Sequence, residues 1–342
     1  MATPLITATQ CFVPKPKEEE KQVEETYKRY RQLIVPTLPR QKGWMSEHLY
    51  MHQDYWFETT IVEGVMYLQE HFKPRPADVL LATAPKCGTT WLKGLIFSII
   101  NRTCYNASAK DHPLLTAGVH ECMPFLEVHL FTDLPIGDTE ILSSPRLLST
   151  HVPYAMLPES ARGPNGCRIV HMWRNPRDAF VSFWHFVTGW RRKAQLSELS
   201  LCEAFDLFSQ GVSPYGPFWD QILGYWKASQ EYPDKVLFLK YEDMKRDPKH
   251  LVKKLAEFLG QPVTVEEEER GVVDEILALC SFESMSKAEV AEKGNFHGGR
   301  PSYKDFFRKG EVGDSKNLLT DDMIRRLEEI TKVKFNGTGL EI

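Results

Sequence analysis

Residues 85–91 combine a lysine, a glycine and two threonines in the order Pro-Lys-Cys-Gly-Thr-Thr-Trp. They follow an apolar segment and precede a helical pattern, so they lie where a strand turns into a helix. A helix start offers free backbone N–H groups and the positive end of a dipole. Gly88 lets an anion approach that backbone, and Lys86 adds a mobile positive charge. The segment predicts a P-loop-like phosphate-binding turn, although its spacing is not that of a Walker A loop.

A second group of anion-binding residues surrounds Arg174. This arginine directly precedes Asn175 and Pro176, which suit the N-cap and the first position of a helix, and Ser182 lies further along that helix. A guanidinium beside a helix N-terminus can hold a phosphate with a fork of donors. Residues 308–314, Arg-Lys-Gly-Glu-Val-Gly-Asp, add two cations between glycines and predict a flexible anion clamp.

One histidine is a candidate base. His151 follows a short apolar segment in the run Ser-Thr-His-Val-Pro. A histidine near its ordinary pKa accepts a proton at neutral pH, which suits general-base catalysis. A lone histidine more often has a structural role, so the residue type alone does not decide between the two.

The elements that would position these residues are strands of one parallel sheet. Apolar runs separated by helical patterns are typical of an α/β fold, with a central parallel sheet and helices on both faces. The predicted strands are 78–84, 146–150, 167–173 and 235–240. Helical periodicity is clearest over 92–100, 176–187 and 251–259, the last ending at Gly260.

Each candidate residue also has a structural interpretation. Lys86 could lie on an ordinary turn, Arg174 could form an ion pair, and residues 308–314 could be a solvated loop. Their positions favour function, because Lys86, His151, Arg174 and Tyr241 each lie at or just past the end of a predicted strand. Ligands of open α/β sheets bind at that carboxyl edge. We therefore expect these residues to share one site.

The composition restricts the kinds of partner. The chain has 342 residues, 42% of them apolar, which is enough for one large α/β domain. A formal net charge of −4 gives no general attraction for nucleic acid or an anionic membrane, so an anion site must be local. The sequence has no apolar run long enough to span a membrane and no secretion signal. Seven cysteines without a C-x-x-C pair favour a reducing, cytoplasmic setting over disulfides or a zinc site.

Five blocks in order along the chain resemble the cytosolic sulfotransferase family, in its plant-type branch. They are P-K-x-G-T-T-W-L-K, T-H-x-P, R-N-P-R-D with a later serine, F-L-K-Y-E-D and R-K-G-x-x-G-D, all within residues 80–320. Upstream, Gly43-Trp44, Leu49-Tyr50 and Tyr55-Trp56 also resemble the plant branch. The resemblance implies a single sulfotransferase domain over residues 46–342. Within residues 1–45, the segment 15–31 is dense in Lys, Glu and Arg, which predicts a tail followed by a short surface helix.

The resemblance implies transfer of a sulfonate group from 3′-phosphoadenylyl sulfate (PAPS) to a hydroxyl of a small metabolite, with no metal. Lys86, Cys87, Gly88, Thr89, Thr90 and Trp91 would bind the phosphosulfate end of the donor. Arg174, Ser182, Arg308, Lys309 and Gly310 would hold its 3′-phosphate. Trp91, Tyr241 and Phe282 would line the adenine site, near Cys280 and Ser281. His151 would be the base, and Lys86 would neutralise charge on the leaving oxygen.

Several positions depart from the family pattern. Cys87 stands where serine is usual, and a thiol is a weak hydrogen-bond donor, which puts control of Lys86 and full activity in question. At a helix start beside Lys86 the thiol is expected to have a lowered pKa. Ser149 replaces a lysine common in the animal branch, Gly118-Val119 replaces a usual Asn-Pro, and Ser315 replaces a usual tryptophan. The dimer motif of animal relatives is not visible, which leaves the oligomeric state open.

Two other functions remain as alternatives at this stage. One is a P-loop nucleotide kinase or NTPase, and the other is a PAPS-binding relative with weak catalysis. The acceptor is also open, with flavonoids, steroid-like hormones, hydroxylated jasmonates and desulfo-glucosinolates of plant secondary metabolism as candidates. Its pocket walls are predicted at 55–57, 121–126, 183–184 and 211–218, where aromatic residues favour a flat or apolar molecule.

Overall fold

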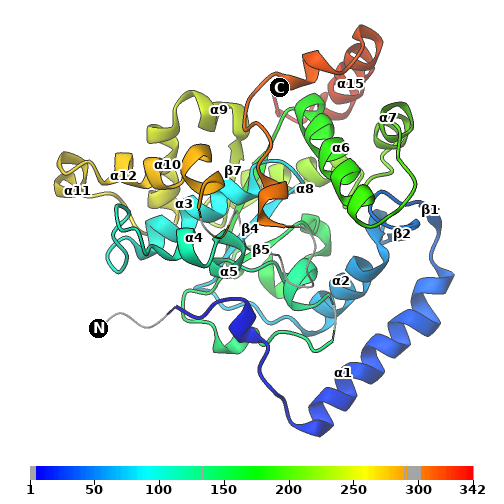
Figure 1. The fold of residues 1–342 in the computed structure, drawn as a ribbon, viewed down its shortest axis with the longest axis horizontal. Coiled ribbons are helices and arrows are strands. Elements are labelled where there is room, and N and C mark those ends of the chain that lie inside the picture. The colour runs from blue at the N-terminus through cyan, green and yellow to red at the C-terminus, as the bar shows by residue number, and fades with distance from the viewer. Residues whose placement is uncertain (1–4, 133, 289, 291–301, 342) are drawn as a thin grey trace.

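A computed structural model describes residues 5–132, 134–288, 290 and 302–341 (Figure 1). Its centre is a parallel sheet in the order β5-β4-β6-β7. The strands are β4 (Val79–Thr83), β5 (Leu147–Thr150), β6 (Arg168–Trp173) and β7 (Val236–Lys240). These bounds confirm all four predicted strands to within a residue at each end. The predicted parallel α/β architecture is therefore correct.

Helices cover both faces of this sheet, as predicted. Successive strand residues point to opposite faces, so Val79 and Leu81 join one apolar cluster while Leu80 and Ala82 join another. The first face is covered by α3 (Thr89–Asn101), α10 (Pro248–Phe258) and α12 (Val272–Leu279). The second is covered by α2 (Thr59–His71) and α8 (Phe218–Glu231). Burial on both faces explains why the strands are continuous apolar runs.

A third apolar cluster joins α6 (Pro176–Lys193), α7 (Leu201–Ser209) and α15 (Asp321–Phe335), which gather in the upper right of Figure 1. The Asn175 side chain caps α6 by accepting a hydrogen bond from the backbone N–H of Arg177, as the sequence predicted. The remaining helices are short: α4 (Pro113–Thr116), α5 (Val119–Cys122), α9 (Tyr241–Arg246), α11 (Val265–Glu269) and α13 (Phe282–Ser286). Across the described residues, every helix is too short or too polar to span a lipid bilayer.

The N-terminal part of the chain contains an element that the sequence did not predict. Strands β1 (Arg40–Lys42), β2 (His48–His52) and β3 (Tyr55–Glu58) form a small antiparallel sheet. The predicted surface helix is present as α1 (Lys17–Arg29), which runs along the outside of the molecule in Figure 1. Tyr27 of this helix is buried in the core and donates a hydrogen bond to the Phe131 carbonyl at 2.5 Å. The division at residue 45 stays a prediction.

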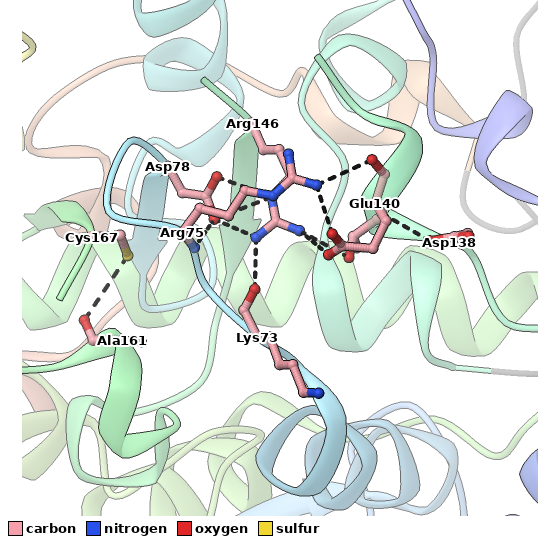
Figure 2. Close-up of polar contacts among 9 residues, drawn as sticks. Lys73, Arg75, Asp78, Asp138, Glu140, Arg146, Ala161 and Cys167 are labelled. Atoms are coloured by element: carbon pink, nitrogen blue, oxygen red, sulfur yellow. Dashed lines mark hydrogen bonds and ion pairs between the residues drawn. The ribbon is translucent and has the colours of Figure 1, made fainter. Parts of the chain in front are cut away.

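A buried ion-pair network closes the amino edge of the parallel sheet (Figure 2). Arg146 is fully buried, with Nη2 2.6 Å from Asp78 Oδ2 and Nη1 2.7 Å from Glu140 Oε1. Its Nη2 also donates to the Lys73 carbonyl at 2.8 Å, and Arg75 reaches the same Glu140 at 2.7 Å. Arg146 and Asp78 directly precede β5 and β4, so the network ties two neighbouring strands together at their first residues.

Candidate active site

One cavity of about 700 Å³ opens at the carboxyl edge of the parallel sheet. Lys86, His151 and Arg174, which follow β4, β5 and β6, line it together with Tyr241, which follows β7. The four strands thus bring together residues as distant in the sequence as Lys86 and Tyr241. This edge is where open α/β sheets bind ligands.

The turn between β4 and α3 exposes backbone to this cavity. Gly88 has a φ of +98°, a conformation that residues with a side chain rarely adopt, and a Cβ there would also crowd the Met172 methyl carbon at 2.3 Å. Within the described chain no side chain caps the start of α3 at Thr89, which leaves the first N–H groups of the helix available. The Thr89 hydroxyl lies 2.6 Å from the Thr83 hydroxyl, which holds the helix start against the strand. The turn has the form of an anion cradle.

Lys86 has a charge without a nearby counter-ion. Its Nζ lies 4.6 Å from the Phe186 ring centroid and 5.8 Å from that of Phe306, and it forms no ion pair among the described residues. Burial, with the charges of Arg174 and Arg308, lowers the pKa of Lys86 to about 8. An anion bound here would favour the charged form and raise this pKa.

Cys87 lies differently from what the sequence predicted. Its thiol is fully buried in the apolar cluster that contains Trp44, Ala84 and Ala179, and it does not line the cavity. Burial raises the pKa of the thiol to about 12, because removal from water outweighs the attraction of Arg174 for a thiolate. The expected lowering of the Cys87 pKa is therefore wrong. Any contact of Cys87 with the donor would have to come from its backbone.

A second group of cations lines the same cavity beside this turn. Arg174 is buried, donates from Nη2 to the Glu311 carbonyl at 2.6 Å, and packs its guanidinium carbon 4.5 Å from the Tyr241 ring centroid. Ser182 of α6 also lines the cavity. The Nε atoms of Arg174 and Arg308 are buried and have no hydrogen-bond partner among the described residues. Buried N–H groups without partners fit an anion that would accept from them.

Residues 308–315 are held in place by two carboxylates. Arg308 Nη1 lies 2.7 Å from Asp314 Oδ2, and Lys309 Nζ lies 2.5 Å from Asp314 Oδ1. Asp178 of α6 accepts from the backbone N–H groups of Gly313 at 2.6 Å and Ser315 at 3.0 Å. The clamp is therefore fastened to the helix that starts beside Arg174. The Ser315 side chain is buried there, and nothing in the structure explains why it replaces a tryptophan.

Aromatic residues form one end of the cavity. The rings of Trp91 and Tyr241 meet edge to face with centroids 6.0 Å apart, and the Tyr241 hydroxyl donates to the Gly310 carbonyl at 3.1 Å. Phe282 lines the same end, as do Cys280 and Ser281. Gly310 has a φ of +68°, and a Cβ there would lie 2.7 Å from Phe282. This end has flat apolar surfaces suited to a heterocyclic base.

His151 is held in one tautomer. Its Nδ1 lies 2.7 Å from the Thr83 carbonyl oxygen, which can only accept, so Nδ1 carries the proton and Nε2 has a free lone pair. Burial lowers the pKa of His151 to about 3, with Lys93 and Lys86 adding to the effect against the Thr83 hydrogen bond. The ring is therefore neutral at physiological pH. The buried Glu127 carboxylate accepts the His151 backbone N–H at 2.8 Å and fixes the chain there.

The walls of the rest of the cavity match the sequence prediction only in part. Phe125, Phe183 and Tyr215 line it, from three of the four predicted segments. The predicted wall at 55–57 is wrong, because β3 directs these residues elsewhere and the following residues 58–61 line the cavity instead. Trp184 also points away and donates to the Leu199 carbonyl.

Sequence analysis missed other lining residues. Phe186 and Trp190 continue the cavity-facing side of α6 from Phe183 at helical spacing, a signal that could have found them. Met45 comes from an irregular segment, and His120 and Phe306 come from α5 and a four-residue 3-10 helix (Tyr303–Phe306), which are too short to show such periodicity.

The geometry defines a P-loop-like α/β protein with an anion site at the carboxyl edge of its sheet. A model of the sulfotransferase domain matches residues 76–339, so the chain belongs to the sulfotransferase family. Cytosolic sulfotransferase 7 of Arabidopsis thaliana is 44% identical over 90% of this chain and 94% of its own length. Cytosolic sulfotransferase 5 of the same plant is 42% identical over 90% of this chain and 95% of its own length. These relatives identify the plant-type branch.

Solved structures agree with this assignment. A crystal structure of an Arabidopsis thaliana sulphotransferase is 34% identical, covers 96% of this chain and 99% of its own, and has a TM-score of 0.73. The structure of mouse sulfotransferase SULT7A1 complexed with PAP is 25% identical to this chain. The match covers 84% of this chain and 94% of the mouse chain, with a TM-score of 0.64. Family membership excludes the nucleotide-kinase alternative.

Proposed function

We propose that this protein is a PAPS-dependent sulfotransferase of class EC 2.8.2.- that acts on a hydroxyl of a small metabolite. The observation that carries the proposal is the convergence of Lys86, Arg174 and the neutral His151 on one cavity at the sheet edge. The Lys86 ammonium, which forms no ion pair among the described residues, and the unpartnered Nε–H of Arg174 supply affinity for an anionic nucleotide, and a free imidazole lone pair supplies a base.

We place the donor in this cavity in the following orientation. Its adenine lies between Trp91, Tyr241 and Phe282, and its 3′-phosphate accepts from Arg174, Ser182 and the clamp Arg308-Lys309-Gly310. The phosphosulfate end lies over the turn formed by Lys86, Gly88, Thr89 and Thr90, where α3 begins. The presence of PAP, the desulfonated donor, in the SULT7A1 structure supports the choice of this nucleotide. The unpartnered Nε atoms of Arg174 and Arg308 favour the same placement.

His151 and Lys86 have separate roles in the proposed transfer. His151 Nε2 takes the proton of the acceptor hydroxyl as its oxygen forms a bond to sulfur. The bond from sulfur to the bridging phosphate oxygen breaks in line, and the electron pair stays on that oxygen. Lys86 stabilises the charge that develops there, as preorganised donors do in other group transfers. The Thr83 carbonyl stabilises the imidazolium through Nδ1. These groups meet the developing charge without a metal.

The acceptor enters beside His151, where the walls are largely aromatic. Phe125 packs 4.7 Å and Tyr215 5.2 Å from the His151 ring, centroid to centroid. A flat hydroxylated metabolite, such as a flavonoid or a steroid-like hormone, suits these rings. We place the reaction in the cytoplasm, consistent with the names of the Arabidopsis relatives.

Donor binding provides the primary test. Ligand at 100 times its Kd stabilises a folded protein by about 2.7 kcal/mol, so 3′-phosphoadenosine 5′-phosphate (PAP) should raise Tm clearly. AMP lacks the 3′-phosphate and should raise it much less. Arg174→Gln should remove most of the difference between the two nucleotides. Equal shifts from PAP and AMP in the natural protein would contradict the proposed site, and absence of sulfonate transfer from labelled PAPS to any of a panel of phenols and sterols would contradict the activity.

A further inference from the structure

Two phenylalanine rings contact the side-chain end of Lys86. Its Nζ lies 4.6 Å from the ring centroid of Phe186 and 5.8 Å from that of Phe306. A cation is attracted by the negative face of an aromatic ring when it lies within about 6 Å of the ring centroid. Both rings satisfy this condition, and the contact with Phe186 is the closer one. Lys86 itself has a φ of +66°, a strained conformation that is typical of functional turns.

The two rings are held next to each other by a contact between their elements. Their centroids are 5.8 Å apart, and their planes make an angle of 29°. Phe186 belongs to α6, and Phe306 is the last residue of its 3-10 helix. Lys193 at the end of α6 has its Nζ 2.5 Å from Asp305 Oδ2 of that 3-10 helix. The ion pair thus keeps the rings stacked, so that they offer Lys86 an aromatic surface in a fixed place.

The charges around Lys86 do not take the place of this surface. Arg174 and Arg308 carry the same charge as Lys86 and repel it. Asp305 attracts it, but this carboxylate is already paired with Lys193. Burial lowers the pKa of two further side chains near Lys86, which are therefore neutral at physiological pH: His120 and His151. The phenylalanine rings thus supply the attraction that holds the ammonium group.

We propose that Phe186 is a positioning residue for Lys86, whose ring holds the lysine ammonium group in the cavity by cation–π attraction before the donor binds. A ring face attracts the ammonium form and not the neutral amine, so the contact also keeps Lys86 charged and ready for an anion. The attraction needs an aromatic face, which an aliphatic side chain of similar size lacks. The role of the held lysine in sulfonate transfer rests on the proposed function, whereas the contact itself does not.

Removal of the ring should change the titration of Lys86. The charged form alone loses the attraction, so Phe186→Leu should lower the Lys86 pKa by about 0.4 to 1.5 pH units. Phe186→Tyr retains the aromatic face and should keep the pKa of the natural protein. Phe183→Leu is the matched control, because Phe183 lines the same cavity from the preceding turn of α6 but stacks on Trp44, with centroids 5.1 Å apart. This control should leave the Lys86 pKa unchanged.

Nuclear magnetic resonance measures this pKa without any enzymatic turnover. In protein labelled with ¹³C at the lysine Cε atoms, the Lys86 signal is assigned by its loss in Lys86→Arg. The ring current of Phe186 should move the Lys86 Hε protons of the natural protein upfield of those of solvated lysines. Absence of that upfield shift would overturn the proposal without recourse to a variant. A Lys86 pKa that falls no further in Phe186→Leu than in Phe183→Leu would also overturn it.

Binding of PAP tests what the held lysine does. Calorimetry without acceptor gives the Kd of PAP for the natural protein and for Phe186→Leu between pH 6 and pH 9. The two affinities should nearly agree at pH 6, where Lys86 is largely charged in both proteins. From a natural pKa of about 8, the expected shift weakens binding to Phe186→Leu by roughly 2- to 30-fold at pH 9. Titration of the nucleotide phosphates is common to both proteins and cancels in the comparison.

Failure of this inference and failure of the proposed function give different results. Equal pH dependence of PAP binding in the natural protein and in Phe186→Leu would overturn the positioning role and leave the sulfotransferase assignment intact. Absence of PAP binding to the natural protein at every pH would instead count against the proposed function, and the Lys86 titration would still decide the cation–π contact. PAP binding at pH 6 also shows that each variant is folded.

Discussion

Cations occupy both edges of the parallel sheet, but in opposite circumstances. At the amino edge the Arg146 guanidinium donates to Asp78, Glu140 and the Lys73 carbonyl, and every one of its nitrogens has a partner (Figure 2). At the carboxyl edge Lys86 lies against aromatic rings, and Arg174 has a buried Nε with no partner in the described residues. The chain thus satisfies one group of charges internally and leaves the other incomplete.

The difference shows how one sheet separates stability from binding. A buried cation with its carboxylates in place fixes strand ends but offers nothing to a ligand. At the carboxyl edge, Lys86 has no carboxylate within ion-pair distance among the described residues, so its charged form gains when an anion arrives. The pKa of Lys86 is lowered to about 8 because burial and the neighbouring Arg174 and Arg308 disfavour its charge while no anion is bound. Mutations at the two edges should therefore affect different measurements.

The largest effect is expected at the carboxyl edge, on turnover. His151→Ala removes the proposed base, and general-base catalysis contributes about 10²- to 10⁴-fold to the rate. kcat should fall by that factor, while the Tm shift caused by PAP should persist because the imidazole faces the acceptor. His71→Ala, a half-exposed histidine at the end of α2, is the control and should leave kcat unchanged. Near-normal turnover of His151→Ala would remove this residue from the mechanism.

The next effect is expected at the amino edge, on stability. Arg146→Ala leaves the Asp78 carboxylate buried without its partner, which typically costs about 3–5 kcal/mol in the free energy of unfolding. Arg246→Ala breaks an exposed pair with Asp243 and should cost about 1 kcal/mol or less. Unfolding by denaturant measures the change in the free energy of unfolding for both variants. If Arg146→Ala lowered PAP affinity while stability stayed unchanged, the separation of the two edges would be refuted.

The pH dependence should also reflect the carboxyl edge. Lys86 is charged below its pKa, so kcat/KM for PAPS should be lost as the pH rises through about 8. Bound donor favours the charged form, so the corresponding fall in kcat should occur at higher pH. No loss is expected near pH 6.5 from His151, because its pKa is about 3 and the ring is already neutral there.

Lys86→Arg provides the matched comparison for this profile. A guanidinium stays charged over the whole range, so the alkaline fall in kcat/KM should disappear even if the rate itself is lower. An unchanged alkaline limb in Lys86→Arg would assign the titration to another group.

The smallest effect is expected at Cys87. Because its thiol is buried outside the cavity, Cys87→Ser should leave kcat and the hydrolysis of PAPS without acceptor unchanged. Iodoacetamide at neutral pH should modify the exposed Cys104 and Cys202 and spare Cys87, as peptide mapping by mass spectrometry would reveal. Loss of activity through alkylation of Cys87, with protection by PAP, would contradict this buried placement.

Much of the sheet was predictable because buried parallel strands are continuous apolar runs. The runs after residues 78, 146, 167 and 235 gave strand ends to within a residue. The antiparallel sheet was not predictable in the same way. Arg40–Lys42 is wholly exposed, so β1 has no apolar pattern at all. Its place depends on pairing with His48–His52, which periodicity within one segment does not reveal.

The candidate site was likewise predictable only in part. Residues that follow predicted strands, such as Lys86 and Arg174, were found because strand ends meet at one edge. The orientation of single side chains could not be predicted from the sequence, as Cys87 demonstrates. It neighbours Lys86 in sequence, yet its side chain is buried in the apolar cluster that contains Trp44 and does not line the cavity. Phe306 reaches Lys86 only through tertiary structure, and no local pattern near residue 306 indicates that contact.

The attachment of the clamp to α6 has a consequence during synthesis of the chain. Domains of growing chains fold as their segments emerge, N-terminal parts first. Strands β4 to β7 are complete by Lys240, whereas the residues that Asp178 holds, Gly313 and Ser315, emerge much later. A nascent chain can therefore build its sheet and its phosphate turn before it can retain a nucleotide. Until the clamp arrives, the Asp178 carboxylate and the Arg174 guanidinium, 3.9 Å apart, have mainly each other for a partner.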